Sequence, residues 1–402
     1  MALPTALASL ILLISVSGRP ALARPQLVDD SQCGCFMTNG SNVAYYAEHR
    51  FYDFQSLLKY QGVPDPITDA DGNAVAPATS DYFLSQDWNS TWGIQSWNNS
   101  ASSLAAGTAT VLMVNSPNNI YVEKNADSAP SSQTYLTMRT IRHSNFQSAA
   151  EIESVKTDYK FVSIRMLART TGSPGAVTAM FTYRSASELA KIQEADLEIR
   201  TQDPRNTIQY TNQPSYTAGG DDIPQATQNV TLPNHLDWTD WAVHRLDWTP
   251  KQSTWYVDGV EVASITFQTP REPSQIILNA WSDGGDWSGN MTLHDQAYLQ
   301  IQWLEMVFNS TGPVPGWTDS GDASKTRRDA LLRDIIRRES GNSQCQSVCS
   351  IDDSNTTGVA TMLWKSSASR IGSSKVNGSL VQLIPLAAAV ALALPMFPLS
   401  QF

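Results

Sequence analysis

The sequence predicts an all-β sandwich, and three observations support this prediction. Short runs of Val, Ile, Thr, Tyr, Phe and Trp alternate with Gly, Pro, Asn and Asp from about residue 32 to residue 312. Asp258-Gly259 stands between two such runs and is a strong signal for a hairpin turn. No long helical period interrupts this region. Packed antiparallel sheets are the natural class for such a pattern.

The clearest strand candidates are apolar or alternating runs. They are Thr110–Val114, Tyr159–Met166, Ala176–Tyr183, Trp241–Trp248, Thr254–Val257 and Leu299–Phe308. A short charged helix is expected outside the sandwich, at Asp329–Arg337.

Three carboxylates, Glu194, Asp196 and Glu198, alternate with two apolar residues. On a strand, all three acids would share one face, and Ala195 and Leu197 would point into a core. On a helix, Glu194 and Glu198 would be neighbours that repel each other, and Asp196 would face elsewhere. The strand is therefore the coherent interpretation.

Like charges in such a row raise at least one pKa. Two carboxyl groups with separated pKa values are what hydrolysis of a glycosidic bond requires. Two other interpretations fit the five residues alone: a solvated strand face and a calcium site. We expect no metal or other cofactor, with a structural calcium ion as the alternative; no further oxygen ligands near Glu194 are identifiable in the sequence.

Composition narrows the class of partner. The net charge of −11 and the pI of about 4.9 argue against nucleic acid. Ten of the 12 Trp lie between Trp88 and Trp303. Aromatic rings pack on the C–H faces of sugars, although we expect over half of these Trp in the core. We expect a monomer.

The N-terminus resembles a secretory signal peptide over residues 1–23. Leu7–Val16 is apolar, and Ala21–Ala23 is a small-x-small cleavage site, although a positive n-region is missing. Eight Asn-x-Ser/Thr sequons agree with a secreted glycoprotein. They begin at Asn39, Asn89, Asn98, Asn229, Asn290, Asn309, Asn355 and Asn377.

The C-terminus predicts a lipid anchor. Residues 350–374 are rich in Ser, Thr and Asn and are expected to form a solvated stalk. The small triplet Gly372–Ser374, with Ser366–Ala368 as an alternative, precedes an apolar tail, so residues 375–402 fit a GPI-attachment signal. A transmembrane helix is the rival interpretation. We expect a secreted protein at the cell surface or cell wall.

The four cysteines lie near the two ends of the expected domain. Cys33 and Cys35 begin it, and Cys345 and Cys349 close a C-terminal extension, residues 313–349. Without a His pattern, zinc is disfavoured. Four cysteines allow three pairings. Because a bridge between Cys33 and Cys35 is sterically poor, we expect two disulfides that tie the N-terminal segment to the extension.

Four further groups of residues follow the acids in order. They are Tyr210–Asn212, His244–Pro250, Trp255–Gly259, and Gln275–Trp281 with Gly285–Trp287. Together with the acids they resemble the motifs of glycoside hydrolase family 16, and Cys33–Phe54 looks like its secreted fungal members. The resemblance covers roughly Cys33–Thr311. It implies a concanavalin A-like β-jelly-roll sandwich with a glycan-binding cleft, and a catalytic domain over residues 28–312.

The resemblance also implies roles for individual residues. Glu194 would be the nucleophile of a retaining mechanism, Glu198 the general acid/base and Asp196 the helper between them. Cα atoms four residues apart on a strand are about 13 Å apart, and a retaining enzyme needs its carboxyl groups about 5 Å apart. Two long Glu side chains that lean together on a concave strand close much of that gap.

Five residues of these motifs are candidates for substrate binding: Tyr210, Asn212, His244, Trp281 and Trp287. Trp281 and Trp287 would stack on sugar rings, with core packing as the alternative. Tyr210 and Asn212 would bond to sugar hydroxyls. His244 is a cleft residue or a satisfied strand histidine. Two other Trp of the motifs, at 248 and 255, are expected in the core.

The predicted function is a retaining glycoside hydrolase of the endo-β-1,3(1,4)-glucanase type. A cell-wall glucan transglycosylase would use the same acids with a sugar hydroxyl as acceptor. A chitin-binding cysteine module is not recognisable, which mildly disfavours crosslinking of chitin to glucan. The alternative from another class is a lectin-like glycan-binding protein, which would be expected to lose one of the three acids.

Overall fold

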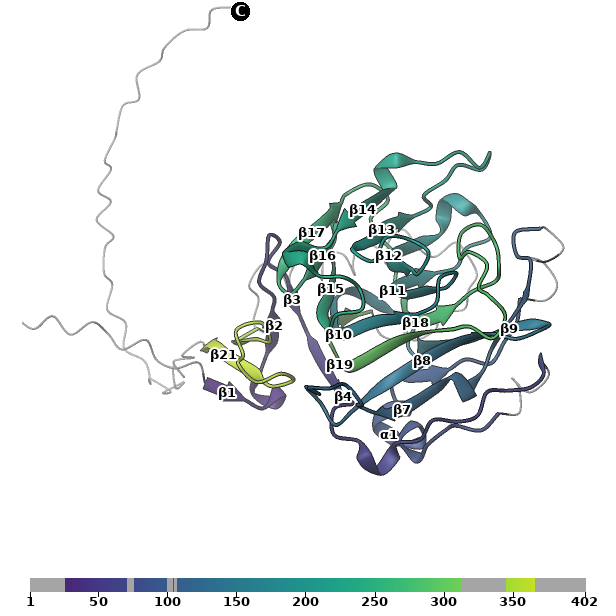
Figure 1. Ribbon diagram of the computed structural model, residues 1–402. Coiled ribbons are helices and arrows are strands. Elements are labelled where there is room, and N and C mark those ends of the chain that lie inside the picture. The colour runs from purple at the N-terminus through teal and green to yellow at the C-terminus, as the bar shows by residue number, and fades with distance from the viewer. Residues whose placement is uncertain (1–25, 71–75, 100–103, 105–106, 312–344, 366–402) are drawn as a thin grey trace, which may run out of the picture. The chain divides into compact units, whose positions relative to one another are not determined.

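The computed structural model describes residues 26–70, 76–99, 104, 107–311 and 345–365. Two layers of antiparallel strands pack face to face and are joined by the pairing of β8 with β9 (Figure 1). The front layer contains β14 (Thr227–Thr231), β13 (Thr207–Gln213), β12 (Gln193–Arg200), β11 (Val177–Arg184), β18 (Gln275–Trp281) and β9 (Phe146–Ser154), with β5 (Trp92–Ile94) and β6 (Leu112–Asn115) beside β9.

The back layer runs from β7 to β17. It contains β7 (Ile120–Lys124), β8 (Thr134–Arg142), β19 (Gln296–Ser310) with β4 (Glu48–Asp53), β10 (Tyr159–Gly172), β15 (Ala242–Trp248), β16 (Ser253–Val257) and β17 (Val260–Ile265). The predicted all-β sandwich is confirmed. Asp258 and Gly259 join β16 to β17 with φ of 48° and 77°, as a tight hairpin requires.

Helical segments in the described residues are short. The α-helix α1 (Gln86–Asn89) spans 4 residues. The 3₁₀ turns are η1 (Asp30–Gln32), η2 (Leu58–Tyr60), η4 (Asp81–Leu84), η5 (Pro117–Asn119), η6 (Leu189–Lys191), η7 (Pro224–Ala226) and η8 (Pro233–His235). Within the same residues, no helix is long and apolar enough to cross a membrane.

One hydrophobic core fills the space between the layers. In β12, the alternation of the sequence sends Ala195, Leu197 and Ile199 into this core, where each is at most 2% exposed. Trp248 and Trp255 are buried there from the back layer, as expected. The opposite side of β12 is thereby left for its carboxylates.

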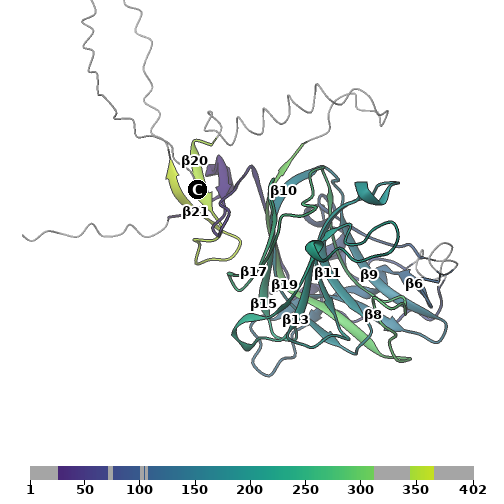
Figure 2. The ribbon, with the colours of Figure 1, turned by 90° about the horizontal axis from the view of Figure 1, so that it is seen from above.

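A second, smaller sheet joins the two ends of the described chain. It contains β1 (Gln26–Val28), β21 (Ala360–Lys365), β20 (Ser347–Ser350), β2 (Cys35–Met37) and β3 (Tyr45–Tyr46). Figure 2 shows it on the side of β10, away from β11. Disulfides join Cys33 to Cys349 and Cys35 to Cys345, so both tie the N-terminal segment to the C-terminal one, as expected.

The described part of the expected stalk is folded, which corrects the sequence interpretation of residues 350–365. Ala360 and Thr361 are buried in β21, and the Asp352 side chain is only 4% exposed. The disulfides and the small sheet hold these residues against the rest of the protein and bury them. A composition rich in Ser and Thr does not indicate this. Residues 366–374, the signal peptide, the charged helix and the GPI-attachment signal lie outside the described residues.

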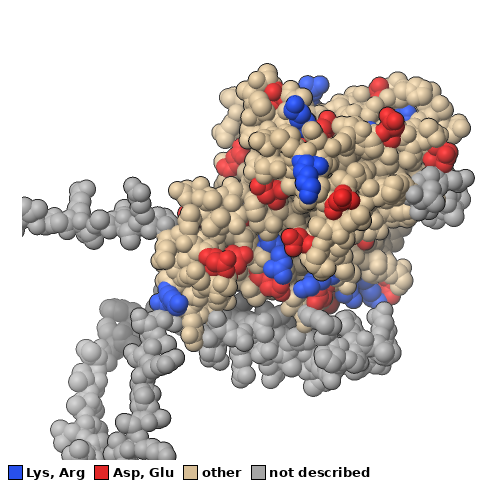
Figure 3. All heavy atoms as spheres, turned by 90° about the horizontal axis from the view of Figure 1, so that it is seen from below, with Lys and Arg blue, Asp and Glu red and all other residues tan. Residues whose placement is uncertain are grey.

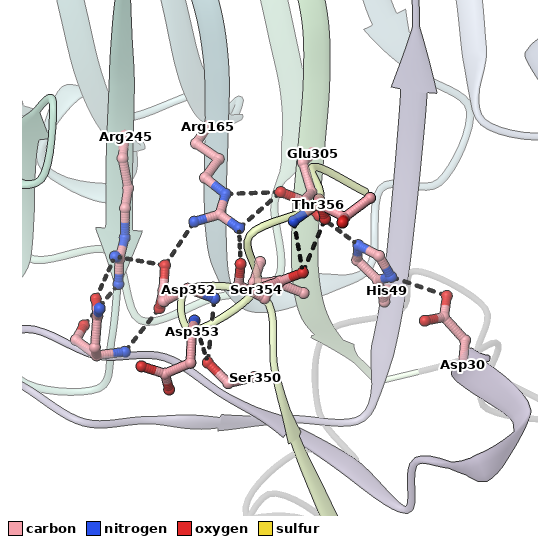
Figure 4. A network of polar contacts seen from close by, with 12 residues as sticks. Asp30, His49, Arg165, Arg245, Glu305, Ser350, Asp352, Asp353, Ser354 and Thr356 are labelled. Carbon is pink, nitrogen blue, oxygen red and sulfur yellow. Dashed lines mark hydrogen bonds and ion pairs between the residues drawn. The ribbon is translucent and has the colours of Figure 1, made fainter. Parts of the chain in front are cut away.

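Buried ion pairs attach the small sheet to the outer face of the back layer (Figure 4). Arg165 binds Glu305 at 2.7 Å and Asp352 at 2.5 Å, and Arg245 binds Asp352 at 3.2 Å and Asp247 at 2.6 Å. We call this network, with its disulfides, the clasp.

His49 completes the clasp and makes its stability depend on pH. Its Nδ1 lies 2.8 Å from Asp30 and its Nε2 2.9 Å from Glu305. Burial alone would lower the pKa of His49, but hydrogen bonds to these carboxylates and their charges raise it to about 9. The folded protein therefore holds a proton here that the unfolded chain releases at a lower pH.

We expect the free energy of unfolding to fall as pH rises from about 6.5 through about 9. The contribution of His49 is complete below the unfolded pKa of 6.5 and is lost above the folded value of about 9. A loss of about 3 kcal/mol is the upper limit for such a shift. Urea unfolding at pH 6 and pH 9.5 measures it. If His49→Gln shows the same slope between these two pH values as the unsubstituted protein, the assignment is wrong.

Candidate active site

The three acids project from the outer face of the front layer, on β12. We call this side the acid face. In the registers of β12 with β11 and β13, Tyr183 and Gln213 flank Glu194 on the acid face, Phe181 and Thr211 flank Asp196, and Ala179 and Gln209 flank Glu198. The alternation predicted from the sequence therefore places all three acids on one surface.

Burial raises the pKa of each acid. Asp196 is only 2% exposed, and the charges of Glu194 and Glu198 raise its pKa further. Gln213 Nε2 donates to Asp196 Oδ2 at 3.3 Å, and a side-chain hydrogen bond to Glu194 raises the pKa of Asp196 as well. Asp196 therefore favours its neutral form, and the row carries fewer than three negative charges.

The two glutamates have different surroundings. Burial and the charge of Glu198 raise the pKa of Glu194, while Asp196 opposes this as a hydrogen-bond donor. Burial also raises the pKa of Glu198, but a hydrogen bond from Trp287 and the charge of Arg200 oppose it. The pKa values are thus raised to about 8 for Glu194 and about 7 for Glu198, and different neighbours oppose the rise in each case.

Trp281 and Trp287 lie where a sugar could reach them. Trp281 ends β18 opposite Val177, half-buried on the acid-face side, and Trp287 is 40% exposed. The guanidinium of Arg200 lies 4.5 Å from the centre of the Trp287 ring. Both residues remain candidates for stacking on a sugar.

Tyr210 and Asn212 are not on the acid face, which corrects their assignment as sugar-binding residues. They lie opposite Leu197 and Ala195, so their side chains point to the core side, and both are 0% exposed. Tyr210 packs 5.4 Å from the Trp255 ring. Asn212 Nδ2 donates to two backbone carbonyls of the back layer, those of residues 265 and 267, so it joins the layers.

His244 is likewise a core residue and not a substrate ligand. It lies opposite Met166 and Val257 on the inner face of the back layer and is 1% exposed. Among the residues that the structure describes, neither ring nitrogen has a hydrogen-bond partner, and burial lowers the pKa of His244 to about 4. It is therefore neutral.

Several acid-face residues escaped the sequence analysis. Glu151 on β9 lies opposite Asn279 on β18, and its carboxylate accepts from Trp97 Nε1 at 2.8 Å and from Asn279 Nδ2 at 3.4 Å. Burial raises the pKa of Glu151 to about 7. The alternation of Glu151, Ile152 and Glu153 repeats the pattern of β12 and could have revealed this pair.

No group of three or more His, Cys, Asp or Glu side chains in the described residues could hold a metal ion.

Replacing Trp287 by Phe should raise the pKa of Glu198, because the hydrogen bond that stabilises its carboxylate is lost. We expect the alkaline limb of the pH dependence of any activity that uses Glu198 as an acid to move to higher pH. Trp97→Phe is the matched control, since Trp97 is similarly exposed and bonds Glu151 instead. An equal movement of the limb in both variants, or in neither, would contradict the prediction.

Known proteins share the region that carries this site. Residues 110–304 match the profile of "Glycosyl hydrolases family 16". A beta-glucanase of Paenibacillus polymyxa is 26% identical over 34% of this chain and 54% of its own length. A beta-glucanase of Bacillus amyloliquefaciens is 27% identical over 38% of this chain and 62% of its own. The chain thus spans between half and two thirds of these relatives.

Among solved structures, an endo-beta-1,3-glucanase from Pyrococcus furiosus has a TM-score of 0.42 and 20% identity, covering 55% of this chain and 89% of that chain. The profile match includes all three acids and the strands on both sides of them. Residues 110–304 thus form a domain of glycosyl hydrolases family 16.

Proposed function

We propose that the protein is a retaining glycoside hydrolase that cleaves β-linked glucan. The observation that carries this proposal is the row of Glu194, Asp196 and Glu198 on one strand face, where burial raises the pKa of each acid. Family membership and the beta-glucanases that the chain resembles support glucan as the substrate.

The surroundings of the acids fit a double displacement. Glu194 attacks the anomeric carbon as a carboxylate, while Glu198 protonates the leaving oxygen. After the first step Glu198 is a carboxylate, and Trp287 and Arg200 stabilise its charge. In the second step Glu198 takes a proton from the water that attacks the anomeric carbon, and Glu194 is released as a carboxylate. A neutral Asp196 donates a hydrogen bond to Glu194 and holds it in place without adding charge.

The substrate is a neutral polymer. On the face shown in Figure 3, Asp and Glu are interspersed with Lys and Arg, without a field of one sign that would attract a polyanion. Indole rings at 97, 281 and 287 offer partly exposed surfaces for sugar rings on the acid-face side.

The test uses the soluble domain with laminarin, lichenan, and labelled glucan or chitin oligosaccharides as acceptors. Release of shorter glucans with retained anomeric configuration supports a hydrolase. Transfer of glucan to a labelled acceptor would make the protein a transglycosylase with the same acids. Binding of glucan without any cleavage would favour the lectin-like alternative.

We also propose secretion, N-glycosylation and anchoring to the membrane by GPI. The two disulfides support an oxidising compartment. Sequon residues 39, 89, 98, 229, 290 and 355 are exposed, so glycans could be attached there. Release of the protein from cells by a phosphatidylinositol-specific phospholipase is expected, and retention of the C-terminal peptide in the mature protein would overturn the anchor.

A further inference from the structure

The outer face of the back layer carries a cavity of about 440 Å³, away from the acids. Its floor is formed by β7, β8, β10 and β19, and its rim by the segment 63–66. The residues that matter for its chemistry are Tyr121, Glu123, Arg139, Thr171, Tyr298 and Gln300.

Strand register brings these side chains to one face. Tyr298 lies opposite Arg139 on β8 and Thr171 on β10, and Gln300 lies opposite Thr137 and Arg169. The alternate positions of β19, such as Leu299 and Ile301, enter the core, so the polar residues must face outward. The cavity is therefore built by rigid strands.

The walls of the cavity combine aromatic rings with polar groups that can still form hydrogen bonds with a ligand. Tyr298 is half-buried and donates to Gln296 Oε1 at 2.8 Å, so its oxygen can still accept. Thr137 donates to Glu123 Oε2, and no other hydrogen bond to this carboxylate is present in the described part of the chain. Gln300 Oε1 accepts from Arg169, and within the described residues its Nε2 amide bonds no protein group.

The charge of the cavity does not favour an anion. The Arg139 guanidinium is committed to Asn119 Oδ1, the Pro64 carbonyl and Asn118, and it lies 5.1 Å from the centre of the Tyr121 ring. Glu123 supplies an opposing carboxylate whose pKa is raised by burial. A neutral ligand rich in hydroxyl groups fits this balance better than a phosphate or a carboxylate.

A further aromatic surface continues on the same side. Arg169, beside Gln300, lies 4.4 Å from the Trp241 ring centre and 5.7 Å from that of Tyr135, and Asp127 binds both Arg169 and Trp241. A ligand longer than one sugar could extend from the cavity over the half-buried Trp241.

We propose that this cavity is a second glycan-binding site, which holds one or two sugar units of a glucan chain on the back layer. The choice of glucan rests on the proposed function, whereas the existence of a neutral sugar site rests on the cavity itself. Such a site would keep the protein on a polymer while the acid face acts on another segment.

The experiment measures laminarin binding by affinity electrophoresis and calorimetry in the cleavage-deficient Glu194→Gln protein. Adding Tyr298→Ala should weaken binding roughly three- to tenfold at one class of sites. Tyr298→Phe, which keeps the ring, should retain most of the affinity. Trp281→Ala, on the acid-face side, should affect the other class. Tyr45→Ala is the matched control, since this exposed Tyr lies in the small sheet.

A single class of sites that Trp281→Ala abolishes and Tyr298→Ala leaves unchanged would overturn the proposal, as would no laminarin binding at all. Should Tyr298→Ala fail to fold, Thr171→Arg fills the same cavity from β10 and should weaken the same class. Laminarin binding that depends on Tyr298, in a protein that cleaves neither laminarin nor lichenan, would overturn the proposed function and support this site.

Discussion

Glu194→Gln should reduce cleavage of β-glucan by roughly a thousandfold or more, because it removes the nucleophile of a covalent step. The amide keeps the size of the side chain and the packing of β12, so a collapse of the fold is not expected. Reducing-end assays on laminarin and lichenan measure the loss, with circular dichroism as the check on folding.

Azide separates the roles of the two glutamates better than the loss of activity does. In Glu194→Ala, azide should enter the vacated side and give an α-glycosyl azide from an activated aryl glucoside. In Glu198→Gln, the first step should survive on that substrate, and azide should intercept the intermediate to give the β-azide. This division of products does not depend on which carboxyl group holds the proton in the free protein.

Two further variants on the acid face test the assignment of the catalytic acids. Asp196→Asn should have an intermediate effect, because it disturbs the orientation and charge of the nucleophile without deleting it. Glu153→Gln on β9 is the matched control, since it changes a half-buried carboxyl group outside the row. Full activity in Glu194→Gln and Glu198→Gln, or products of inverted configuration, would show that this strand is not a retaining site.

Asp352→Ala should destabilise the protein by about 3–5 kcal/mol, because it leaves two buried cations without their shared partner. Asp352 Oδ1 accepts from Arg165 and Arg245, and Oδ2 accepts from the Asn39 backbone at 2.7 Å. The two disulfides would remain, so the loss reflects the ion pairs together with the hydrogen bond from Asn39. Urea unfolding monitored by Trp fluorescence measures it.

Asp353→Ala provides the control at the next position, where the side chain is exposed. It should change the free energy of unfolding by less than about 0.5 kcal/mol. Equal effects of the two variants would mean that the clasp contributes nothing through Asp352.

The fold and the acid row could be predicted because both depend on local alternation. Strand β12 displays its acids on one face and its apolar residues on the other, and this needs no knowledge of the partner strands. The disulfides between the two ends of the domain could also be predicted, since a bridge between Cys33 and Cys35 is sterically poor.

The substrate-binding residues were harder to predict, because the position of each side chain depends on how the strands pair and on the layer to which each strand belongs. Tyr210 and Asn212 belong to a motif that resembles a sugar-binding element. In the structure they lie opposite Leu197 and Ala195 on the neighbouring strand, so their side chains point to the core side. His244 faces the core from the other layer. The clasp was missed because pairing Asp352 with Arg165, 187 positions away, leaves no local pattern.

The small sheet lies on the side of the molecule opposite to the acids. Its β1 and β21 pair side by side, so the described chain begins and ends on adjacent strands, at Gln26 and Lys365. This sheet is attached to the outer face of the back layer through Arg165 and Arg245, whereas the acids face outward from the front layer. The acid face and the small sheet are therefore on opposite sides of the described molecule, so a ligand can approach the acids without crossing the small sheet.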